Sequence, residues 1–281
     1  MNEIISKEEI GPNTFRYRIH HPKIAKKRKA GQFIILRTHD GGERLPLTIV
    51  DSDPEAGTVT LIFQAVGHST KELALLAVGD RLIDLAGPLG EPTHIENYGT
   101  ACVIGGGYGT APVLPIAAAL GEAGNDLIGI IGARNKDLVI LESELGDICR
   151  RLEVATDDGT HGHKGFVTDV LANLIEEGES IAFVLAVGPT PMMRAVSNLT
   201  REHNIPTMVS LNPIMIDGTG MCGGCRVEVG GETKFACVDG PEFDAHEVNF
   251  ELLMKRQGTY KSMEAEADDG HSHCTVGLTK T

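Results

Sequence analysis

The stretch Ala101-Cys102-Val103-Ile104-Gly105-Gly106-Gly107-Tyr108-Gly109-Thr110-Ala111-Pro112 decides the fold of the central part of the chain. Its first four residues are apolar, as in a short buried strand, and residues 113–120 have the pattern of a helix. Glycines between a strand and a helix let a pyrophosphate approach the free amides of the helix N-terminus. The stretch therefore predicts a dinucleotide-binding βα unit, with an ordinary tight turn as the alternative.

Strands and helices continue to alternate after this unit. We expect strands at 127–131, 152–155 and 181–187, and helices at 138–149, 167–176 and 192–202. Such alternation predicts a doubly wound parallel sheet, which we place at residues 98–211. Gly188-Pro189-Thr190-Pro191-Met192 then ends a strand at the carboxyl edge, where ligands bind in open α/β folds. A helix start with proline in its first turn is the alternative.

Residues 1–97 have a different pattern, that of an all-β domain. Strands are expected at 15–19, 33–36, 58–66 and 80–85, and one helix is expected to begin with Ser69 or Thr70 as its N-cap. Two short motifs in this domain suggest phosphate or cofactor contacts. They are Arg44-Leu45-Pro46-Leu47-Thr48 and Gly67-His68-Ser69-Thr70. A surface arginine with a buried threonine, and a simple helix cap, are the alternatives.

The strongest local signal is Asp217-x4-Cys222-x2-Cys225-x11-Cys237. Plant-type [2Fe–2S] ferredoxins use a C-x4-C-x2-C spacing followed by a distant cysteine, and Asp217 stands where the first cysteine would be. A zinc site completed by Asp217 or His246 and a thioredoxin-like C-x-x-C pair stay open as alternatives. We assign residues 212–250 to this region and residues 251–281 to a C-terminal extension or tail.

Composition excludes some classes of function. The chain has 281 residues and a formal net charge of −14, which disfavours nucleic acid as a partner. Its N-terminus lacks the pattern of a secretory signal, and no apolar stretch is long enough for a membrane span. We therefore expect a cytoplasmic protein.

Taken in order, the motifs resemble the ferredoxin–NADP reductase superfamily over almost the whole chain. The matching positions are Arg44, Pro46 and Thr48, then residues 105–112 and residues 188–193. The cysteine cluster is similar to that of the electron-transfer subunit of dihydroorotate dehydrogenase. Asp217 and Gly240-Pro241-Glu242-Phe243-Asp244 look more like the small subunit of NADH-dependent reduced ferredoxin:NADP oxidoreductases.

The resemblance implies a β plus α/β fold: an FAD-binding antiparallel β-barrel, the nucleotide-binding α/β domain, and a small C-terminal iron–sulfur subdomain. It implies FAD contacts from Arg44, Pro46, Leu47, Thr48, Gly67, Ser69 and Thr70. It implies NAD(H) contacts from Gly106, Gly107, Gly109, Thr110, Gly188, Pro189 and Met192. The cluster ligands would be Asp217, Cys222, Cys225 and Cys237.

We thus expect an NAD(P)H-linked flavin iron–sulfur oxidoreductase subunit that moves electrons between NAD(H), FAD and a [2Fe–2S] cluster. No side chain is needed as a general acid or nucleophile, because hydride chemistry belongs to the cofactors. The resemblance implies an electron-bifurcating heterodimer whose larger subunit carries another flavin and [4Fe–4S] clusters. The alternatives are the dihydroorotate dehydrogenase subunit and a zinc-stabilised, nucleotide-binding regulatory subunit.

Overall fold

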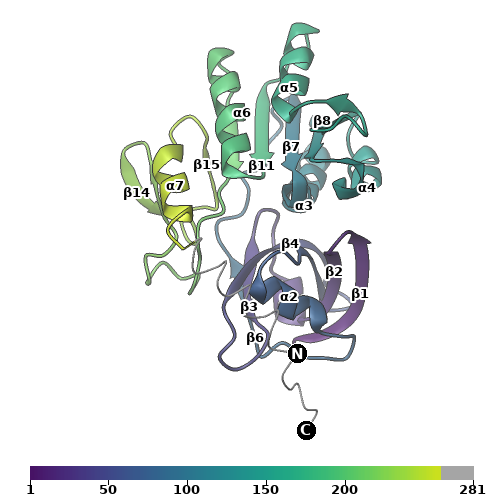
Figure 1. Cartoon of the computed structure of the whole chain (residues 1–281), viewed down its shortest axis with the longest axis vertical. Coiled ribbons are helices and arrows are strands. Elements are labelled where there is room, and N and C mark those ends of the chain that lie inside the picture. Colours follow the sequence, from purple (N-terminus) through teal and green to yellow (C-terminus); the bar gives the residue numbers. More distant parts are fainter. Residues whose placement is uncertain (261–281) are drawn as a thin grey trace.

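The computed structural model describes residues 1–260 and has three parts. A barrel forms the lower part in Figure 1, an α/β domain lies above it, and a small region with β14 and α7 lies to one side. The expected tail residues 261–281 lie outside the described residues. None of the helices within residues 1–260 is long and apolar enough to cross a membrane.

The N-terminal part is a six-stranded antiparallel sheet in the order β1-β2-β5-β4-β3-β6. Its strands are β1 Glu3–Gly11, β2 Thr14–His20, β3 Phe33–Arg37, β4 Leu45–Asp53, β5 Thr58–Gln64 and β6 Asp84–Leu89. Residues just before β6 bond to the first strand: the Ile4 amide donates to the Asp80 carbonyl (2.9 Å) and the Leu82 amide to the Asn2 carbonyl (3.0 Å). These bonds bring the two ends of the sheet together into a barrel.

Two short helices, α1 Pro22–Ala25 and α2 His68–Leu75, accompany the barrel. Tyr17 lies in the barrel core with its ring edge against Phe63, and its hydroxyl donates to the Leu73 carbonyl of α2 at 3.0 Å. Burial of the hydroxyl with this acceptor fixes α2 across the barrel. The N-cap of α2 is Gly67, two residues earlier than the expected Ser69.

The central part is a seven-stranded sheet in the order β10-β9-β8-β7-β11-β12-β15, parallel except for β15 at its edge. Its strands are β7 Thr100–Gly106, β8 Asp126–Ala133, β9 Arg151–Thr156, β10 His163–Lys164, β11 Phe183–Val187, β12 Thr207–Ser210 and β15 Glu242–Asp244. The helical elements are η1 Gly107–Gly109, α3 Thr110–Glu122, η2 Lys136–Leu138, α4 Glu142–Gly146, α5 Val167–Glu176 and α6 Thr190–Glu202.

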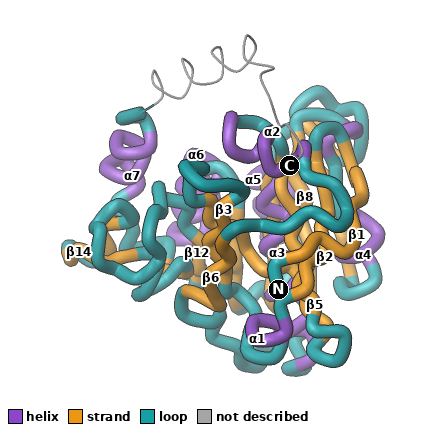
Figure 2. The backbone as a smooth tube through the Cα atoms, turned by 90° about the horizontal axis from the view of Figure 1, so that it is seen from below, coloured by secondary structure: helices purple, strands orange, loops and turns teal. Residues whose placement is uncertain are grey.

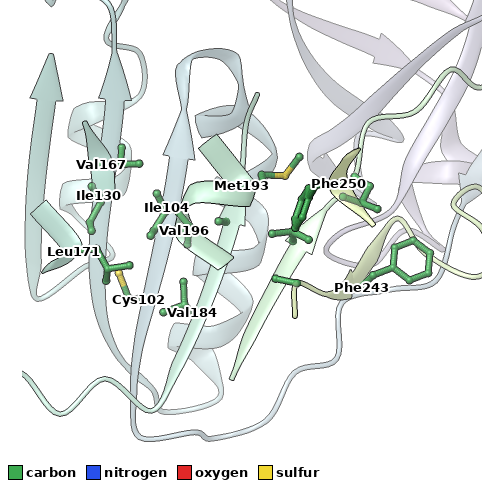
Figure 3. Packing of buried hydrophobic residues seen from close by; sticks show 14 of the residues in the cluster. Cys102, Ile104, Ile130, Val167, Leu171, Val184, Met193, Val196, Phe243 and Phe250 are labelled. Carbon is green, nitrogen blue, oxygen red and sulfur yellow. The ribbon is translucent and has the colours of Figure 1, made fainter. Parts of the chain in front are cut away.

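Helices cover both faces of this sheet. Ala101 and Val103 of β7 pack on the side of α3 and α4. Cys102 and Ile104 pack on the opposite side, with residues of α5 and α6 (Figure 3). Successive side chains of a strand point to opposite faces, so a strand buried on both sides reads as a continuous apolar run. The observed architecture confirms the predicted fold class.

The C-terminal region packs on α6 and the edge of the sheet. It contains a hairpin of β13 Arg226–Val229 and β14 Glu232–Phe235, and the helix α7 Phe250–Gln257. Phe243 of β15 and Phe250 of α7 share a core with Met193 and Val196 of α6 (Figure 3). Because α7 runs across the boundary that we expected at residue 250, the packed region extends beyond it.

Other local expectations were wrong. The helix expected at 138–149 is split into η2 and the short α4, because Leu141 takes a left-handed conformation (φ +59°) that a helix cannot contain. The strand expected at 80–85 begins at Asp84, since the preceding residues bond to β1 instead. The strand β12 carries no alternating pattern and was not predicted. The expected domain division at residues 97 and 98 falls between β6 and β7 and stays a prediction.

Candidate functional site

The two nucleotide-loop motifs pack directly against each other. A Cβ at Gly106 would lie 2.3 Å from Met192 Sδ, and a Cβ at Gly109 would lie 2.2 Å from the Val187 carbonyl oxygen. A Cβ at Gly188 would lie 3.1 Å from the Gly106 Cα. The structure thus places the two motifs together at the carboxyl edge of β7 and β11, and only glycine fits where they touch.

A cavity of about 500 Å³ lies beside these loops. It runs along the carboxyl ends of the parallel strands, where open α/β sheets bind ligands. The barrel residues Thr14 and Gln64 also line it, so it opens toward the barrel. Among the residues predicted for NAD(H), its lining includes Gly106, Gly107, Pro189 and Met192. Thr110, also predicted, is fully buried at the start of α3.

The other residues that line this cavity include Arg134, Asp157 and Phe166. Arg134 and Asp157 directly follow β8 and β9, and Phe166 precedes α5 with 63% of its surface exposed. Neither Asp157 nor Phe166 was predicted. Their positions, just after β9 and just before α5, could have indicated that they line the cavity, because side chains at strand ends converge on this edge of the sheet.

The motif Arg44 to Thr48 leads into β4, where successive side chains point to opposite faces of the sheet. Thr48 pairs with Phe33, and Leu47 pairs with Ile34. Leu47 is buried in the barrel core, while Pro46 and Thr48 lie on the other face and are partly exposed. Arg44 is exposed and forms no ion pair with residues 1–260. Its guanidinium is therefore available to an anion.

The start of α2 lies next to this motif. The Ser69 hydroxyl donates to the Glu43 carboxylate, which joins the segment before β4 to the helix. Thr70 Oγ1 accepts from the Gly67 amide (3.1 Å) and donates to the Gly67 carbonyl (3.0 Å). Thr70 therefore caps the helix, and Ser69 is hydrogen-bonded to a carboxylate. The structure brings Arg44, Gly67 and the helix N-terminus into one region, as an FAD diphosphate would require.

The four predicted cluster ligands form two pairs. Cys225 and Cys237 are free thiols with Sγ atoms 3.2 Å apart. The Asp217 carboxylate accepts the Cys222 amide at 2.8 Å and the Thr219 amide at 2.8 Å. Each iron of a [2Fe–2S] cluster takes two protein ligands, so two pairs are what a binuclear centre needs.

A single zinc ion instead needs four ligands around one point. Within residues 1–260, no three His, Cys, Asp or Glu side chains converge in that way. Amide groups also face the sulfurs: Gly224 donates to Cys222 Sγ (3.4 Å) and Cys237 donates to Cys225 Sγ (3.5 Å). Such donors suit anionic thiolates, so the donor set fits the iron–sulfur cluster that the spacing predicts.

The electrostatics of the two pairs differ. The Thr219 amide, with help from the Cys222 amide, lowers the pKa of Asp217. Burial raises the pKa of Cys237 to about 12, with the neighbouring Cys225 adding to the shift. Asp217 is thus an anion at neutral pH, whereas the Cys237 thiol is protonated until a metal centre displaces the proton.

The cluster loop lies against the barrel. A Cβ at Gly218 would lie 2.7 Å from Leu89 Cδ1 and 2.8 Å from Ile35 Cδ1. Ile35 of β3 pairs with Pro46 of β4, so the loop contacts the strand next to the predicted flavin strand. The hairpin with β14 lies on the side of β3 and β6, away from β1 and α4 (Figures 1 and 2). The three predicted sites therefore occur in the order nucleotide, flavin, cluster.

Comparison with known proteins shows the family to which the chain belongs. The electron-transfer subunit homolog of dihydroorotate dehydrogenase B (NAD(+)) from Thermotoga maritima is 48% identical, over 94% of this chain and 93% of that protein. This chain belongs to the family of dihydroorotate dehydrogenase B electron-transfer subunits and their homologues. A member from Bacillus cereus (strain G9842) is 33% identical over 87% of this chain and 96% of its own length.

Family models and solved structures extend the assignment. The iron–sulfur cluster binding domain of dihydroorotate dehydrogenase B matches residues 212–249, and the oxidoreductase NAD-binding domain matches residues 103–198. A chain of the solved NADH-dependent reduced ferredoxin–NADP oxidoreductase superposes with a TM-score of 0.91 at 46% identity, covering 97% of this chain and 98% of that chain. Phthalate dioxygenase reductase shares the fold (TM-score 0.62, 17% identity, 81% and 85% covered).

These matches confirm the predicted superfamily. The chain is an electron-transfer subunit of the oxidoreductase type. The predicted cofactors, FAD, NAD(H) and an iron–sulfur cluster, agree with its fold and its two matched domains. The individual contacts predicted for the cofactors stay predictions.

Proposed function

We propose that this chain moves electrons between NAD(H), FAD and a [2Fe–2S] cluster within a flavin-based electron-bifurcating ferredoxin:NADP oxidoreductase. The observation that supports this most is the spatial order of the three sites. The nucleotide cavity opens toward the barrel through Thr14 and Gln64, and the cluster loop contacts β3 through Gly218. Bound FAD exchanges a hydride with nicotinamide and single electrons with iron–sulfur, so it belongs between the other two.

The chain's own residues bind and orient the cofactors. Arg44 and the amides at the start of α2 would hold the FAD diphosphate, and the outward face of β4 with Pro46 and Thr48 would face the flavin. The loop from Gly106 to Thr110 would receive the NAD(H) diphosphate, with Pro189 and Met192 beside the nicotinamide half. Asp217 and Cys222 would hold one iron, and Cys225 and Cys237 the other.

A larger partner is part of the proposal. The exposed apolar residues Ile216 (52% exposed) and Met221 (88% exposed) flank the cluster loop, and Cys222 is itself exposed. Exposed apolar groups gathered at one place favour a protein contact. After four cluster ligands the sequence has too few cysteines for [4Fe–4S] clusters, so these would come from the partner.

The second candidate is the electron-transfer subunit of NAD-dependent dihydroorotate dehydrogenase. The match of residues 212–249 to the iron–sulfur domain of that enzyme favours it. Asp217 in place of a first cysteine and the TM-score of 0.91 favour the bifurcating enzyme. The internal electron route is the same in both.

Purification from the native source tests the proposal. We expect FAD, iron and acid-labile sulfide in the chain, flavin bleaching with NADH, and a partner with flavin and [4Fe–4S] clusters. A partner that binds FMN and oxidises dihydroorotate would replace the first candidate by the second. Zinc without iron, together with the absence of flavin absorption, would refute both and favour the regulatory subunit.

A further inference from the structure

The segment Gly240-Pro241-Glu242-Phe243-Asp244 follows the last cluster cysteine, and none of the three sites uses it. Its residues Glu242–Asp244 form β15, which pairs antiparallel with β12, so that Ser210 stands opposite Glu242. The Leu211 amide donates to the Pro241 carbonyl at 2.9 Å. The segment therefore ties the C-terminal side of the cluster region to the beginning of the cluster loop.

The Glu242 side chain instead contacts Thr93, in the segment that follows β6, and lies beside Gly31, just before β3. The Thr93 hydroxyl donates to Glu242 Oε1 at 2.6 Å, across 149 residues of sequence. A Cβ at Gly31 (φ +81°) would lie 2.3 Å from Thr93 Oγ1 and 2.7 Å from Glu242 Oε1. The pair is closely covered by the Gly31 backbone, and no larger residue fits there.

Further hydrogen bonds connect this pair to the flavin strand. The Glu91 amide donates to the Gly240 carbonyl (2.6 Å), and the Thr93 amide donates to the Ala30 carbonyl (2.9 Å). The Gln32 side chain donates to the Gly90 carbonyl (2.9 Å), and the Gln32 carbonyl accepts the Ile49 amide of β4 (3.1 Å). A continuous path thus runs from β15 through residues 90–93 to β4.

A carboxyl group is an unusual choice for such a contact. Burial raises the pKa of Glu242 to about 7, with the Thr93 hydroxyl opposing the shift. An apolar side chain would fill this place without the desolvation cost, and buried polar pairs are instead suited to fixing one geometry. The chemistry of the pair therefore favours a positioning role over a purely stabilising one.

We propose that the Thr93–Glu242 hydrogen bond holds the cluster-bearing segment at a fixed position against the flavin-bearing barrel, and that Glu242 is a positioning residue for electron transfer between flavin and cluster. This inference rests on the proposed function. Its structural consequence, a tight seam between residues 90–93 and residues 240–242, does not depend on bound cofactors.

Three full-length variants test the proposal. Glu242→Ala and Thr93→Val each remove one partner, whereas Glu242→Gln keeps an acceptor oxygen for Thr93 and serves as the matched control. We expect hydrogen exchange at the amides of Glu91 and Leu211 to rise on the order of tenfold in the first two variants, and to stay near the wild-type rate in Glu242→Gln. In the cofactor-loaded protein, we expect slower cluster reduction in the same two variants, with flavin reduction by NADH unchanged.

Several outcomes would overturn the proposal. Wild-type exchange and wild-type cluster reduction in Thr93→Val would show that the hydrogen bond positions nothing, even if Glu242→Ala fails to fold. Slow cluster reduction in Glu242→Gln with normal exchange would show that charge, not position, matters. A protein that contains no flavin or iron would refute the proposed function, and hydrogen exchange would still decide whether the seam exists.

Discussion

The nucleotide loops and the cluster loop both depend on glycine, and Gly109 and Gly223 show two different physical reasons for it. Gly109 has an ordinary helical backbone (φ −58°), yet a side chain there would collide with the Val187 carbonyl. Gly223 has a left-handed backbone (φ +69°), yet its nearest neighbour would be 3.9 Å from a Cβ. Gly109 is thus required for close packing, and Gly223 for its backbone conformation. A pattern of glycines alone does not distinguish these two needs.

The largest effect is expected from substitutions of Asp217. Its carboxylate is a predicted cluster ligand and also accepts hydrogen bonds from two amides of the cluster loop. Asp217→Cys should retain a [2Fe–2S] cluster with a changed reduction potential. Asp217→Ala should lower cluster occupancy on the order of tenfold or more, measured by iron content and visible spectra. Asp217→Asn keeps an acceptor oxygen, so it is the control for loop folding. Full occupancy with unaltered spectra in Asp217→Ala would show that Asp217 is not a ligand.

In the nucleotide loops, Gly109→Ala should lower the free energy of unfolding by about 3 kcal/mol, because a backbone carbonyl cannot move aside as a side chain can. In Gly109→Ala, NADH should also reduce the flavin poorly. Gly121→Ala, within the helix α3 that Gly109 precedes, is the control: its Cβ would lie 3.5 Å from Leu127, an ordinary contact. Thermal unfolding and NADH titration measure both variants. Equal stability of the two would refute close packing as the reason for Gly109.

The stability that comes from the seam between residues 90–93 and residues 240–242 should depend on pH. The folded pKa of Glu242 is about 7 and its ordinary value is 4.5. The folded state thus holds the proton more tightly, and the free energy of unfolding falls as pH rises from 4.5 to 7, by as much as about 3 kcal/mol. Above pH 7 this loss is complete. Glu242→Gln should abolish this part of the pH dependence in denaturant titrations, and an unchanged pH profile would contradict the raised pKa.

The smallest effect is expected at Gly223. Gly223→Ala should cost about 1 kcal/mol, the strain of a left-handed backbone, since there is space for the methyl group. Gly231→Ala is matched, with φ +77° and open surroundings in the β13–β14 turn. Both should lower stability equally, and Gly223→Ala alone should change the cluster spectrum. A large loss of stability in Gly223→Ala would mean that packing, and not only backbone conformation, requires glycine at this position.

Much of the site follows from local sequence. The spacing of Asp217, Cys222, Cys225 and Cys237 was visible because ligand spacing is local, and the glycine loop was visible because it follows a strand and opens a helix. The helix at 167–176 was predicted with its observed ends. The split at Leu141 and the short strand β12 were missed because tertiary contacts, not local preference, decide them.

By itself, the sequence determined the fold class, the order of the three parts and the chemical type of each site. These depend on periodicity and on spacings within one loop. Only the tertiary structure decided that the four predicted cluster ligands form two pairs, that Asp157 and Phe166 join the nucleotide cavity, and that Thr93 meets Glu242. The physical reason is that these contacts join residues far apart in the chain, and their geometry arises when the sheet edge, the barrel and the cluster loop pack together.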